Sequence, residues 1–346
     1  MLNRRHVLGG LLAAPAVLRA TRAGAQEVSM RLHHFMSGVS PGHNEFLVPW
    51  AEKVAAESDG RIKIDVFPSM QLGGTPPQLY DQARDGVVDV VWTLPGYTAN
   101  RFPKIEVFEL PFVGAQTSRV NSRAVQEFAE ANLADEFAEV HPICFWASDG
   151  GLIHTDTPVT TLDDMAGLKI RFPTRLAGEG LAALGAVPVG MPVPQVPEAV
   201  SQGVIDGAAV PWEIVPSIKL HELVSNHLGF PGTPTFYVST FLLAMNKARY
   251  EGLPEDLRAV IDANSGQAAT DMVAAMFDTN TPKVIDLATQ AGNTITTLSP
   301  EEVARWTEAT QPVRDAWIAA SADQGFDGAA LLAEAQALIA KHGQGA

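Results

Sequence analysis

Apolar and polar residues repeat with two different periods along the chain, and these periods predict its strands and helices. In segment 61–67, polar residues separate Ile62, Ile64 and Val66, which is the two-residue period of a half-buried strand. Segment 45–57 instead places its large apolar residues four positions apart, which is the period of an amphipathic helix. Both patterns recur along most of the remaining chain.

The predicted strands and helices alternate, which is typical of α/β lobes with mixed or mostly parallel sheets. A long helical tract begins at residue 254, and Pro282 is expected to kink it because proline removes a backbone donor. Ser299, followed by a proline and two glutamates, predicts the start of a further helix. The predicted strands are 28–35, 61–67, 87–92, 141–147, 168–172, 187–189, 204–211 and 237–245, and the predicted helices are 45–57, 77–85, 161–166, 176–184, 197–202 and 254–281.

Residues 1–25 have the pattern of an export signal. Arg4 and Arg5 precede a short apolar stretch, 7–18, and the small residues at 23–25 suit cleavage by a signal peptidase. The apolar stretch is too short to anchor the chain in a bilayer. We therefore predict a periplasmic protein, exported by either the Sec or the twin-arginine route. The rest of the chain has no apolar run of about 18 residues, so no membrane insertion of the mature chain is expected.

Charge and cysteine content exclude several classes of protein. The formal net charge is −15, and it becomes more negative once the arginines of the export signal are removed. Nucleic acid and anionic lipid are therefore not expected as partners. An acidic protein that binds an anion needs a local positive site. The only cysteine, Cys144, lies in an apolar run and is expected to be a buried structural residue.

Motifs of the common enzyme classes are absent from the sequence. It contains no nucleophile elbow, zinc-protease motif, phosphate-binding loop or paired CxxC. His33 and His34 are neighbours on a predicted strand and point to opposite faces, so they cannot share a metal ion. Asp149 and His154, which we interpret as loop residues, could form an acid–base pair, but no nucleophile accompanies them. No catalytic residue, metal site or cofactor is predicted.

Polar and aromatic residues stand at the ends of several predicted strands. Arg171 closes one strand just before a proline. Lobes of this kind bind ligands at the carboxyl ends of their strands, where a guanidinium can hold a carboxylate through two parallel hydrogen bonds. A surface ion pair is the alternative interpretation of Arg171. Trp92, Trp146 and Trp212 occupy comparable positions and could form apolar walls or belong to the core.

Several short motifs follow one another over about residues 28–335. They are 67–74 (FPSMQLGG), 86–89 (GVVD), 110–112 (LPF), 161–171 (TLDDMAGLKIR), 203–207 (GVIDG), 245–247 (MNK) and 253–254 (LP). Together they resemble the solute-binding proteins of tripartite ATP-independent periplasmic (TRAP) transporters, of the dicarboxylate-binding type. Segment 161–171 is the most specific and ends in the arginine that clamps the ligand carboxylate in that family.

The resemblance implies a two-lobed periplasmic-binding-protein fold, in which hinge strands and a long kinked helix join two α/β lobes that close over the ligand. Lobe I would comprise 26–147 and about 237–276, and lobe II 148–236 and about 277–346. The resemblance also implies a carboxylate clamp at Arg171. Its partners would be a small organic acid and the small and large membrane subunits of a TRAP transporter, driven by an ion gradient.

Two departures from the family pattern affect the expected ligand. Ile153 stands where many members carry a second arginine, and segment 206–213 replaces the usual Asp-Gly-x-Glu-Asn. We therefore predict a monocarboxylate with an apolar body, such as a 2-oxo, 2-hydroxy or aromatic acid, rather than sialic acid or a C4-dicarboxylate. Arg175 could replace the missing charge. The predicted ligand contacts are Phe35, Trp92, Asp149, His154, Arg171, Val193, Trp212, Glu213 and Tyr237.

Three other functions remain as alternatives. A binding protein of an ATP-driven importer would share the two-lobed fold, and neighbouring genes would distinguish it. A periplasmic enzyme acting on an organic acid would use Asp149, His154 or Glu213 as its base and would turn its ligand over. A signalling receptor domain is disfavoured because the sequence shows no tethering helix.

Overall fold

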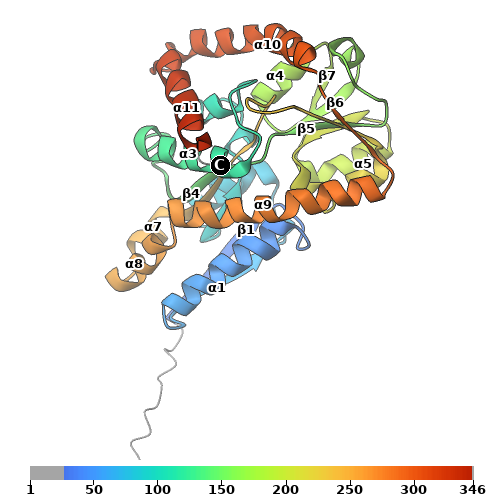
Figure 1. Cartoon of the computed structure of the whole chain (residues 1–346). Coiled ribbons are helices and arrows are strands. Elements are labelled where there is room, and N and C mark those ends of the chain that lie inside the picture. Colours follow the sequence, from blue (N-terminus) through green and yellow to red (C-terminus); the bar gives the residue numbers. More distant parts are fainter. Residues whose placement is uncertain (1–26, 345–346) are drawn as a thin grey trace, which may run out of the picture.

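The computed structural model describes residues 27–344, so the predicted export signal lies outside the described residues. Two β-sheets, each flanked by helices, build the molecule (Figure 1). The α/β prediction is confirmed. Within the described range, no helix combines the length and the apolar character needed to cross a membrane.

The first sheet contains five strands. In spatial order they are β2 (Ile62–Phe67), β1 (Val28–His34), β3 (Val90–Thr93), β10 (Thr240–Asn246) and β4 (Val140–Ala147). Strand β1 is parallel to β2 and β3, whereas β10 is antiparallel to both of its neighbours. The alternation read in segment 61–67 is visible at the start of β2, where Ile62 and Ile64 are buried and Lys63 is exposed.

The second sheet contains six strands. In spatial order they are β11 (Thr294–Thr297), β9 (Asn226–Gly229), β5 (Leu152–Thr155), β8 (Gly207–Val210), β6 (Lys169–Phe172) and β7 (Val187–Gly190). Strand β6 is parallel to β7 and β8, whereas β5 is antiparallel to β8 and β9. The sequence did not predict β5, because four consecutive buried residues are too few to show a period.

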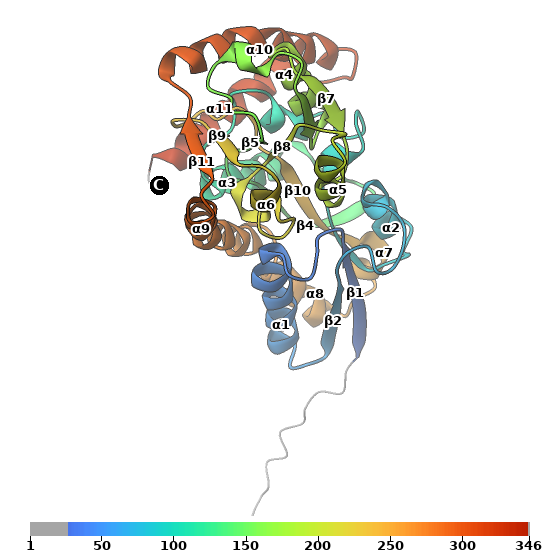
Figure 2. The same ribbon diagram turned by 90° about the vertical axis from the view of Figure 1, so that its right-hand side faces the viewer.

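Helices flank both sheets, and Figure 2 shows α1, α7 and α8 beside β1 and β2, with α4 and α5 beside β7 and β8. The α-helices are α1 (Val48–Glu57), α2 (Leu79–Arg84), α3 (Ser118–Asn132), α4 (Arg175–Ala183), α5 (Val196–Ser201), α6 (Leu220–Leu223), α7 (Lys247–Glu251), α8 (Glu255–Ala263), α9 (Gln267–Gln290), α10 (Pro300–Ser321) and α11 (Gly328–Gly343). Shorter helical turns are η1 (Gly42–Leu47), η2 (Pro76–Gln78), η3 (Pro95–Tyr97), η4 (Ile105–Glu109), η5 (Leu162–Met165), η6 (Val193–Gln195) and η7 (Trp212–Ile214).

The helical tract beyond residue 254 is two helices, so the prediction of one helix over 254–281 was wrong. Gly266 separates α8 from α9 with a backbone φ of +57°, which favours glycine, and its N–H donates to the Ile143 carbonyl at 2.7 Å. Helix α9 then continues through Pro282. It contacts β4 of the first sheet and β11 of the second, and in Figure 1 it runs along both parts of the molecule.

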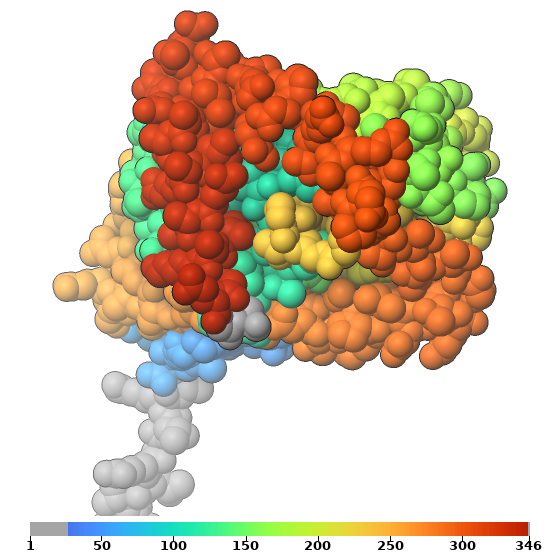
Figure 3. All heavy atoms as spheres, turned by 45° about the horizontal axis from the view of Figure 1, so that its top comes forward, coloured from blue at the N-terminus to red at the C-terminus, as the bar shows by residue number. Residues whose placement is uncertain are grey.

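The C-terminal helices attach to different parts of the molecule. Helix α10 contacts α4, beside the second sheet, whereas α11 contacts α3 and η4. Figure 3 shows these helices in orange and red over one face of the molecule. Helix α11 therefore packs on the side of the first sheet, whereas the expected lobe II includes all of about 277–346. The lobe boundaries remain predictions.

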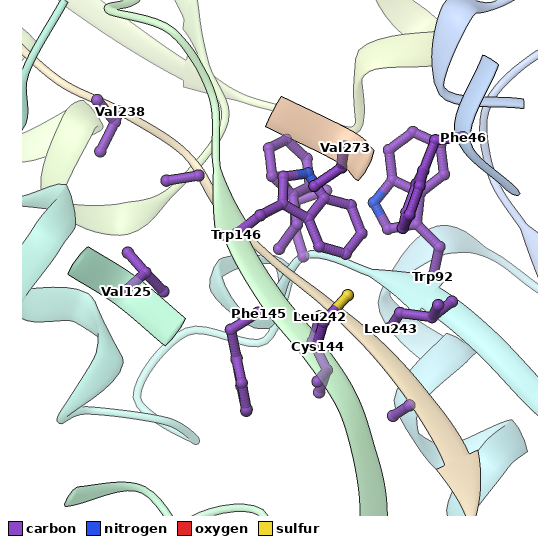
Figure 4. Packing of buried hydrophobic residues seen from close by; sticks show 14 of the residues in the cluster. Phe46, Trp92, Val125, Cys144, Phe145, Trp146, Val238, Leu242, Leu243 and Val273 are labelled. Atoms are coloured by element: carbon purple, nitrogen blue, oxygen red, sulfur yellow. The ribbon is translucent and has the colours of Figure 1, made fainter. Parts of the chain in front are cut away.

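A group of aromatic side chains packs together in the core beside the first sheet. In Figure 4, Trp146 lies beside Trp92, and the ring centroids of these two tryptophans are 5.8 Å apart. Trp146 also stacks on Phe241 at 5.3 Å and is buried, so it belongs to the core. Cys144 is buried in the same cluster, and burial raises the pKa of its thiol. This agrees with the structural role expected for the cysteine.

Candidate functional site

A cavity lies between the two sheets, at the carboxyl ends of their parallel strands. The empty space among its lining residues is about 380 Å³ and is partly open to solvent. Strands β1 and β3 lead to it from one side, and β6 and β8 lead to it from the other. Its lining residues are Phe35, Met36, Trp92, Leu94, Tyr97, Arg171, Pro173, Val193, Val210, Pro211, Glu213, Ile214, Ser239 and Phe241. This position agrees with the rule that α/β lobes bind ligands at strand ends.

Arg171 is the cation of this cavity, and only 2% of it is exposed. Its Nε donates to the Met191 carbonyl and its Nη1 to the Ala209 carbonyl, both at 2.9 Å. No carboxylate of residues 27–344 lies within ion-pair distance of it. Burial lowers the pKa of Arg171, but a guanidinium stays protonated in proteins. The cavity therefore contains a rigidly held positive charge without an ionic partner.

Three further polar atoms near the cavity are buried and have no hydrogen-bond partner among the described residues. They are the Trp92 Nε1, the Tyr237 hydroxyl and the Glu213 Oε2. Nearly all buried polar groups in folded proteins are paired, so a group of orphans at one place indicates a ligand site. Burial raises the pKa of Glu213 to about 8, with the negative charge of Asp149 adding to the effect. The Glu213 carboxyl is therefore protonated near neutral pH.

The walls of the cavity are largely aromatic. The ring centroid of Phe35 lies 5.1 Å from that of Trp92 and 5.6 Å from that of Tyr97. Phe241 lies 6.0 Å from Trp92. Aromatic faces at these separations provide flat apolar surfaces against which a planar ligand can stack. The site thus combines one cation with apolar, largely aromatic walls.

Five of the residues predicted to contact the ligand line this cavity: Phe35, Trp92, Arg171, Val193 and Glu213. Tyr237 is buried and is not among the residues that line the cavity, although Arg171 and Glu213 both affect the pKa of its hydroxyl. The binding role of all six remains a prediction.

Asp149 does not line the cavity and has structural partners. Its carboxylate accepts hydrogen bonds from the Ser118 N–H at the start of α3 and from the Thr281 hydroxyl in α9. Burial raises the pKa of Asp149 to about 6. The side chain thus joins two helices behind the site.

His154 and Trp212 also lie outside the lining of the cavity. His154 belongs to strand β5 rather than to a loop, and its Nδ1 lies 2.7 Å from the Nδ1 of His227. Its Nε2 lies 3.1 Å from the Val210 carbonyl oxygen. The Trp212 ring packs on both histidines, with centroids 5.3 Å from His154 and 5.0 Å from His227. His154 and His227 belong to the neighbouring strands β5 and β9, so the cluster they form with Trp212 packs against the second sheet.

Arg175 does not supply a second charge to the cavity. Its guanidinium forms ion pairs with Glu106 of η4 and, at 2.8 Å, with Glu179 one turn along α4. Two other hollows on the described surface have about 950 and 1130 Å³ of empty space, and Arg175 lines the smaller. Neither hollow contains a buried charged side chain that lacks an ionic partner.

Ser239 and Phe241 were missed because they come from the antiparallel strand of the first sheet. Strand β10 is antiparallel to β3 and pairs Leu243 with Trp92, so the beginning of β10 lies beside the end of β3. These two residues therefore reach the cavity from the start of a strand, whereas the sequence prediction considered only strand ends. Tyr97 follows β3 in η3, and its hydroxyl accepts a hydrogen bond from the Val193 N–H at 3.2 Å.

The histidine pair of β1 shows no metal geometry. His33 Nδ1 lies 2.8 Å from the Gln82 Oε1, and His34 Nε2 lies 3.0 Å from the His43 Nδ1. Within residues 27–344, no group of three or more side chains is arranged to hold a metal ion.

Comparison with known proteins places the chain in a family. Residues 32–320 match the model of the bacterial extracellular solute-binding proteins, family 7. The chain belongs to this family. A TRAP solute-binding protein from Rhodoferax ferrireducens T118, solved with copurified benzoate, is 44% identical with a TM-score of 0.88, over 91% of this chain and 98% of that chain. The resemblance read from the sequence motifs is thereby confirmed.

Two other relatives show the range of ligands in the family. A marine metagenome TRAP solute-binding protein described as specific for aromatic acids, solved with 3-hydroxybenzoate, is 43% identical with a TM-score of 0.89, over 92% of this chain and 99% of that chain. The C4-dicarboxylate-binding periplasmic protein of Rhodobacter capsulatus is 26% identical over 325 residues, 91% of this chain and 94% of that protein. The chain is thus a TRAP-type periplasmic solute-binding protein, and these relatives are binding proteins rather than enzymes.

Proposed function

We propose that this solute-binding protein captures an aromatic monocarboxylate and delivers it to the small and large membrane subunits of a TRAP transporter. The observation that carries the proposal is the buried Arg171 guanidinium, which has no ionic partner within the described chain and lies in a cavity with aromatic walls. A carboxylate would neutralise this charge through hydrogen bonds from the guanidinium. The chain would reach the periplasm through its export signal.

The charge of the cavity supports a ligand with one carboxylate. Arg171 is the only cationic residue among those that line it, and Arg175 is paired with Glu106 and Glu179 outside it. A second carboxylate would be placed against aromatic and aliphatic walls without a counter-charge, which is costly in a buried site. A monocarboxylate leaves no charge uncompensated.

The aromatic body is supported by the walls and by the relatives. Phe35, Trp92, Tyr97 and Phe241 surround the cavity with flat rings. The neighbours at 44% and 43% identity were solved with benzoate and 3-hydroxybenzoate. A third TRAP solute-binding protein, from Bordetella bronchiseptica and 28% identical with a TM-score of 0.84, was solved with mandelate. Of the acid classes compatible with the sequence, the aromatic class is therefore favoured.

Ligand capture would follow from closure of the two lobes. Phe35, Trp92 and Tyr97 come from the first lobe, whereas Arg171 and Glu213 come from the second. A ligand that contacts both sets does so only in the closed state, so it shifts the population toward closure by its differential affinity. Closure also excludes water, which strengthens the ion pair with Arg171.

An enzymatic role has less support. Asp149 and His154 lie behind the cavity with structural partners, and Glu213 holds its proton because burial raises its pKa to about 8. None of these groups is a free base placed beside a nucleophile. The other alternative, a binding protein of an ATP-driven importer, would deliver its ligand to membrane subunits of a different family.

A thermal-shift screen tests the proposed ligand class. We expect benzoate, 3-hydroxybenzoate and mandelate to raise the melting temperature, because a ligand at 100 times its Kd stabilises the folded state by about 2.7 kcal/mol. Succinate, which carries two carboxylates, serves as the matched control and should produce little shift. Stabilisation by succinate but by none of the aromatic acids would contradict the proposal.

Closure can be tested at Gly96, where the two lobes approach each other. A Cβ added to Gly96 of η3 would lie 2.9 Å from the Thr174 Cβ, at the start of α4 in the other lobe. We expect Gly96→Ala to weaken benzoate binding about tenfold, which is about 1.4 kcal/mol, by keeping the lobes apart. Gly343→Ala, where no heavy atom lies within 4 Å, is the control. Equal affinities of both variants and the wild type in calorimetry would show that the lobes do not need this approach.

A further inference from the structure

We infer that Glu213 makes the cavity selective for aromatic acids that carry a hydroxyl group on the ring. This inference rests on the proposed function, since it concerns the same cavity. It assigns a role to a residue of segment 206–213, where the chain departs from the usual family pattern. Arg171 would hold the carboxylate, and Glu213 would bind the hydroxyl.

The position of Glu213 follows from the end of strand β8. The strand stops at Val210, Pro211 continues in extended conformation, and the turn η7 then places Glu213 in the lining of the cavity. Only 9% of Glu213 is exposed. Its Oε2 has no hydrogen-bond partner among residues 27–344. A buried carboxyl that faces a cavity with a free oxygen is available to a ligand.

The Glu213 carboxyl is not part of an ion pair. No lysine, arginine or histidine of the described chain lies within ion-pair distance of it, and Asp149 is the charged side chain that perturbs it most. A negative neighbour and burial both disfavour ionisation, so the carboxyl is neutral. A neutral carboxyl donates one hydrogen bond and accepts others.

A hydroxyl group complements a neutral carboxyl, because it also donates and accepts. An unsubstituted ring would instead leave the Glu213 oxygen unpaired in a water-excluded cavity, which is a penalty against that ligand. Of the two other orphan atoms near the cavity, the Trp92 Nε1 is a donor only, and the Tyr237 hydroxyl belongs to a residue that does not line the cavity. Among the lining residues, Glu213 is therefore the orphan group suited to recognise a hydroxyl.

Arg171 and Glu213 reach the cavity from different elements. Arg171 belongs to strand β6, whereas Glu213 belongs to the turn η7 after strand β8, and both side chains line the cavity. A ligand with its carboxylate at Arg171 could therefore place a ring substituent at Glu213.

One competing role for Glu213 uses the same geometry. The protonated carboxyl could donate to the ligand carboxylate itself, next to Arg171. In that case Glu213 would strengthen the binding of every aromatic acid by the same factor and would not recognise the hydroxyl. The two roles differ in the ratio of affinities for hydroxylated and unsubstituted acids.

Calorimetry with benzoate and 3-hydroxybenzoate distinguishes these roles. We expect the wild type to bind 3-hydroxybenzoate at least about tenfold more tightly than benzoate, which corresponds to about 1.4 kcal/mol. In Glu213→Leu the ratio should fall below about threefold, with benzoate binding retained. Glu213→Gln, whose amide still donates and accepts, should keep most of the ratio. Ser239→Ala removes another hydroxyl from the cavity wall and tests whether that group recognises the ligand hydroxyl instead of Glu213. Ser201→Ala, which removes an exposed hydroxyl outside the cavity, is the matched control and should keep all of the ratio.

Several outcomes would overturn the inference. These are a wild-type ratio below about threefold, an equal loss of both acids in Glu213→Leu, and loss of the ratio in Ser239→Ala alone. The wild-type ratio is decisive even if Glu213→Leu does not fold, which melting curves would reveal. Failure of the wild type to bind either acid would instead contradict the proposed function.

Discussion

Replacing Arg171 with methionine is expected to weaken the binding of benzoate at least about a hundredfold. The guanidinium is buried, and two of its nitrogens are fixed by the Met191 and Ala209 carbonyls at 2.9 Å, so it is preorganised for a carboxylate. Removing one partner of a buried ion pair costs about 3–5 kcal/mol, because the other charge is left without compensation. Arg171→Lys should lose at least about tenfold, since an ammonium cannot reproduce the planar arrangement of donors.

Stability measurements separate this loss of binding from misfolding. In the ligand-free protein, Arg171→Met removes an unpaired buried cation, which is favourable, but leaves two carbonyl groups without donors, which is unfavourable. These effects oppose each other, so we expect the ligand-free melting temperature to change little. Arg305→Met, which removes a surface arginine paired with Glu302 and Asp163, is the control for binding. Unchanged affinity of Arg171→Met in calorimetry would show that Arg171 does not bind the ligand carboxylate.

Glu213 is expected to lower the unfolding free energy of the ligand-free protein as the pH rises from about 4.5 to about 8. The ordinary pKa of this glutamate is 4.5, and burial raises it to about 8 in the folded state. Within that window the native state keeps a proton that the unfolded state has lost. The native state therefore binds more protons, and stability decreases with rising pH by an amount on the order of a few kcal/mol.

Glu213→Gln isolates this contribution because its amide does not titrate. At pH 4.5 or below the variant and the wild type should have similar stability, and at pH 8.5 the variant should be the more stable by urea unfolding. Glu109, whose pKa burial raises to about 7, contributes a fall of the same sign in both proteins. Burial lowers the pKa of His154 to about 3, so its contribution is lost as the pH falls below 6.5. A difference between variant and wild type that does not change with pH would show that Glu213 ionises normally.

Much of the architecture was predictable because local patterns agree with the tertiary structure. The segment around Ser299 was predicted to start a helix, and α10 begins at Pro300 with the Ser299 hydroxyl accepting from the Glu302 N–H at 3.2 Å. The helix predicted at 161–166 is the turn η5, which starts with a capping box formed by Thr161 and Asp164. These features depend on residues three or four positions apart, so the sequence shows them directly.

Other elements were not predictable from local patterns. Helix α3 has a mixed sequence whose buried face includes Ser118, Asn121 and Ser122, and these polar residues are buried because they bond to neighbouring backbone groups. The break between α8 and α9 depends on Gly266, which donates to the distant Ile143 carbonyl. In both cases contacts between distant segments outweigh the local signal.

The sequence by itself determined the α/β class and the family and proposed Arg171 as the carboxylate-binding residue, because strand ends, caps and short motifs are local features. Only the tertiary structure decided which candidate side chains share one cavity. Arg171 and Arg175 are four positions apart on the chain, yet one is a buried unpaired cation and the other is bound to Glu106 and Glu179. Glu213 and Asp149 are both buried acids, but only Glu213 faces the cavity. Pairing and burial depend on what the rest of the fold brings to each side chain, and a single sequence does not contain those distances.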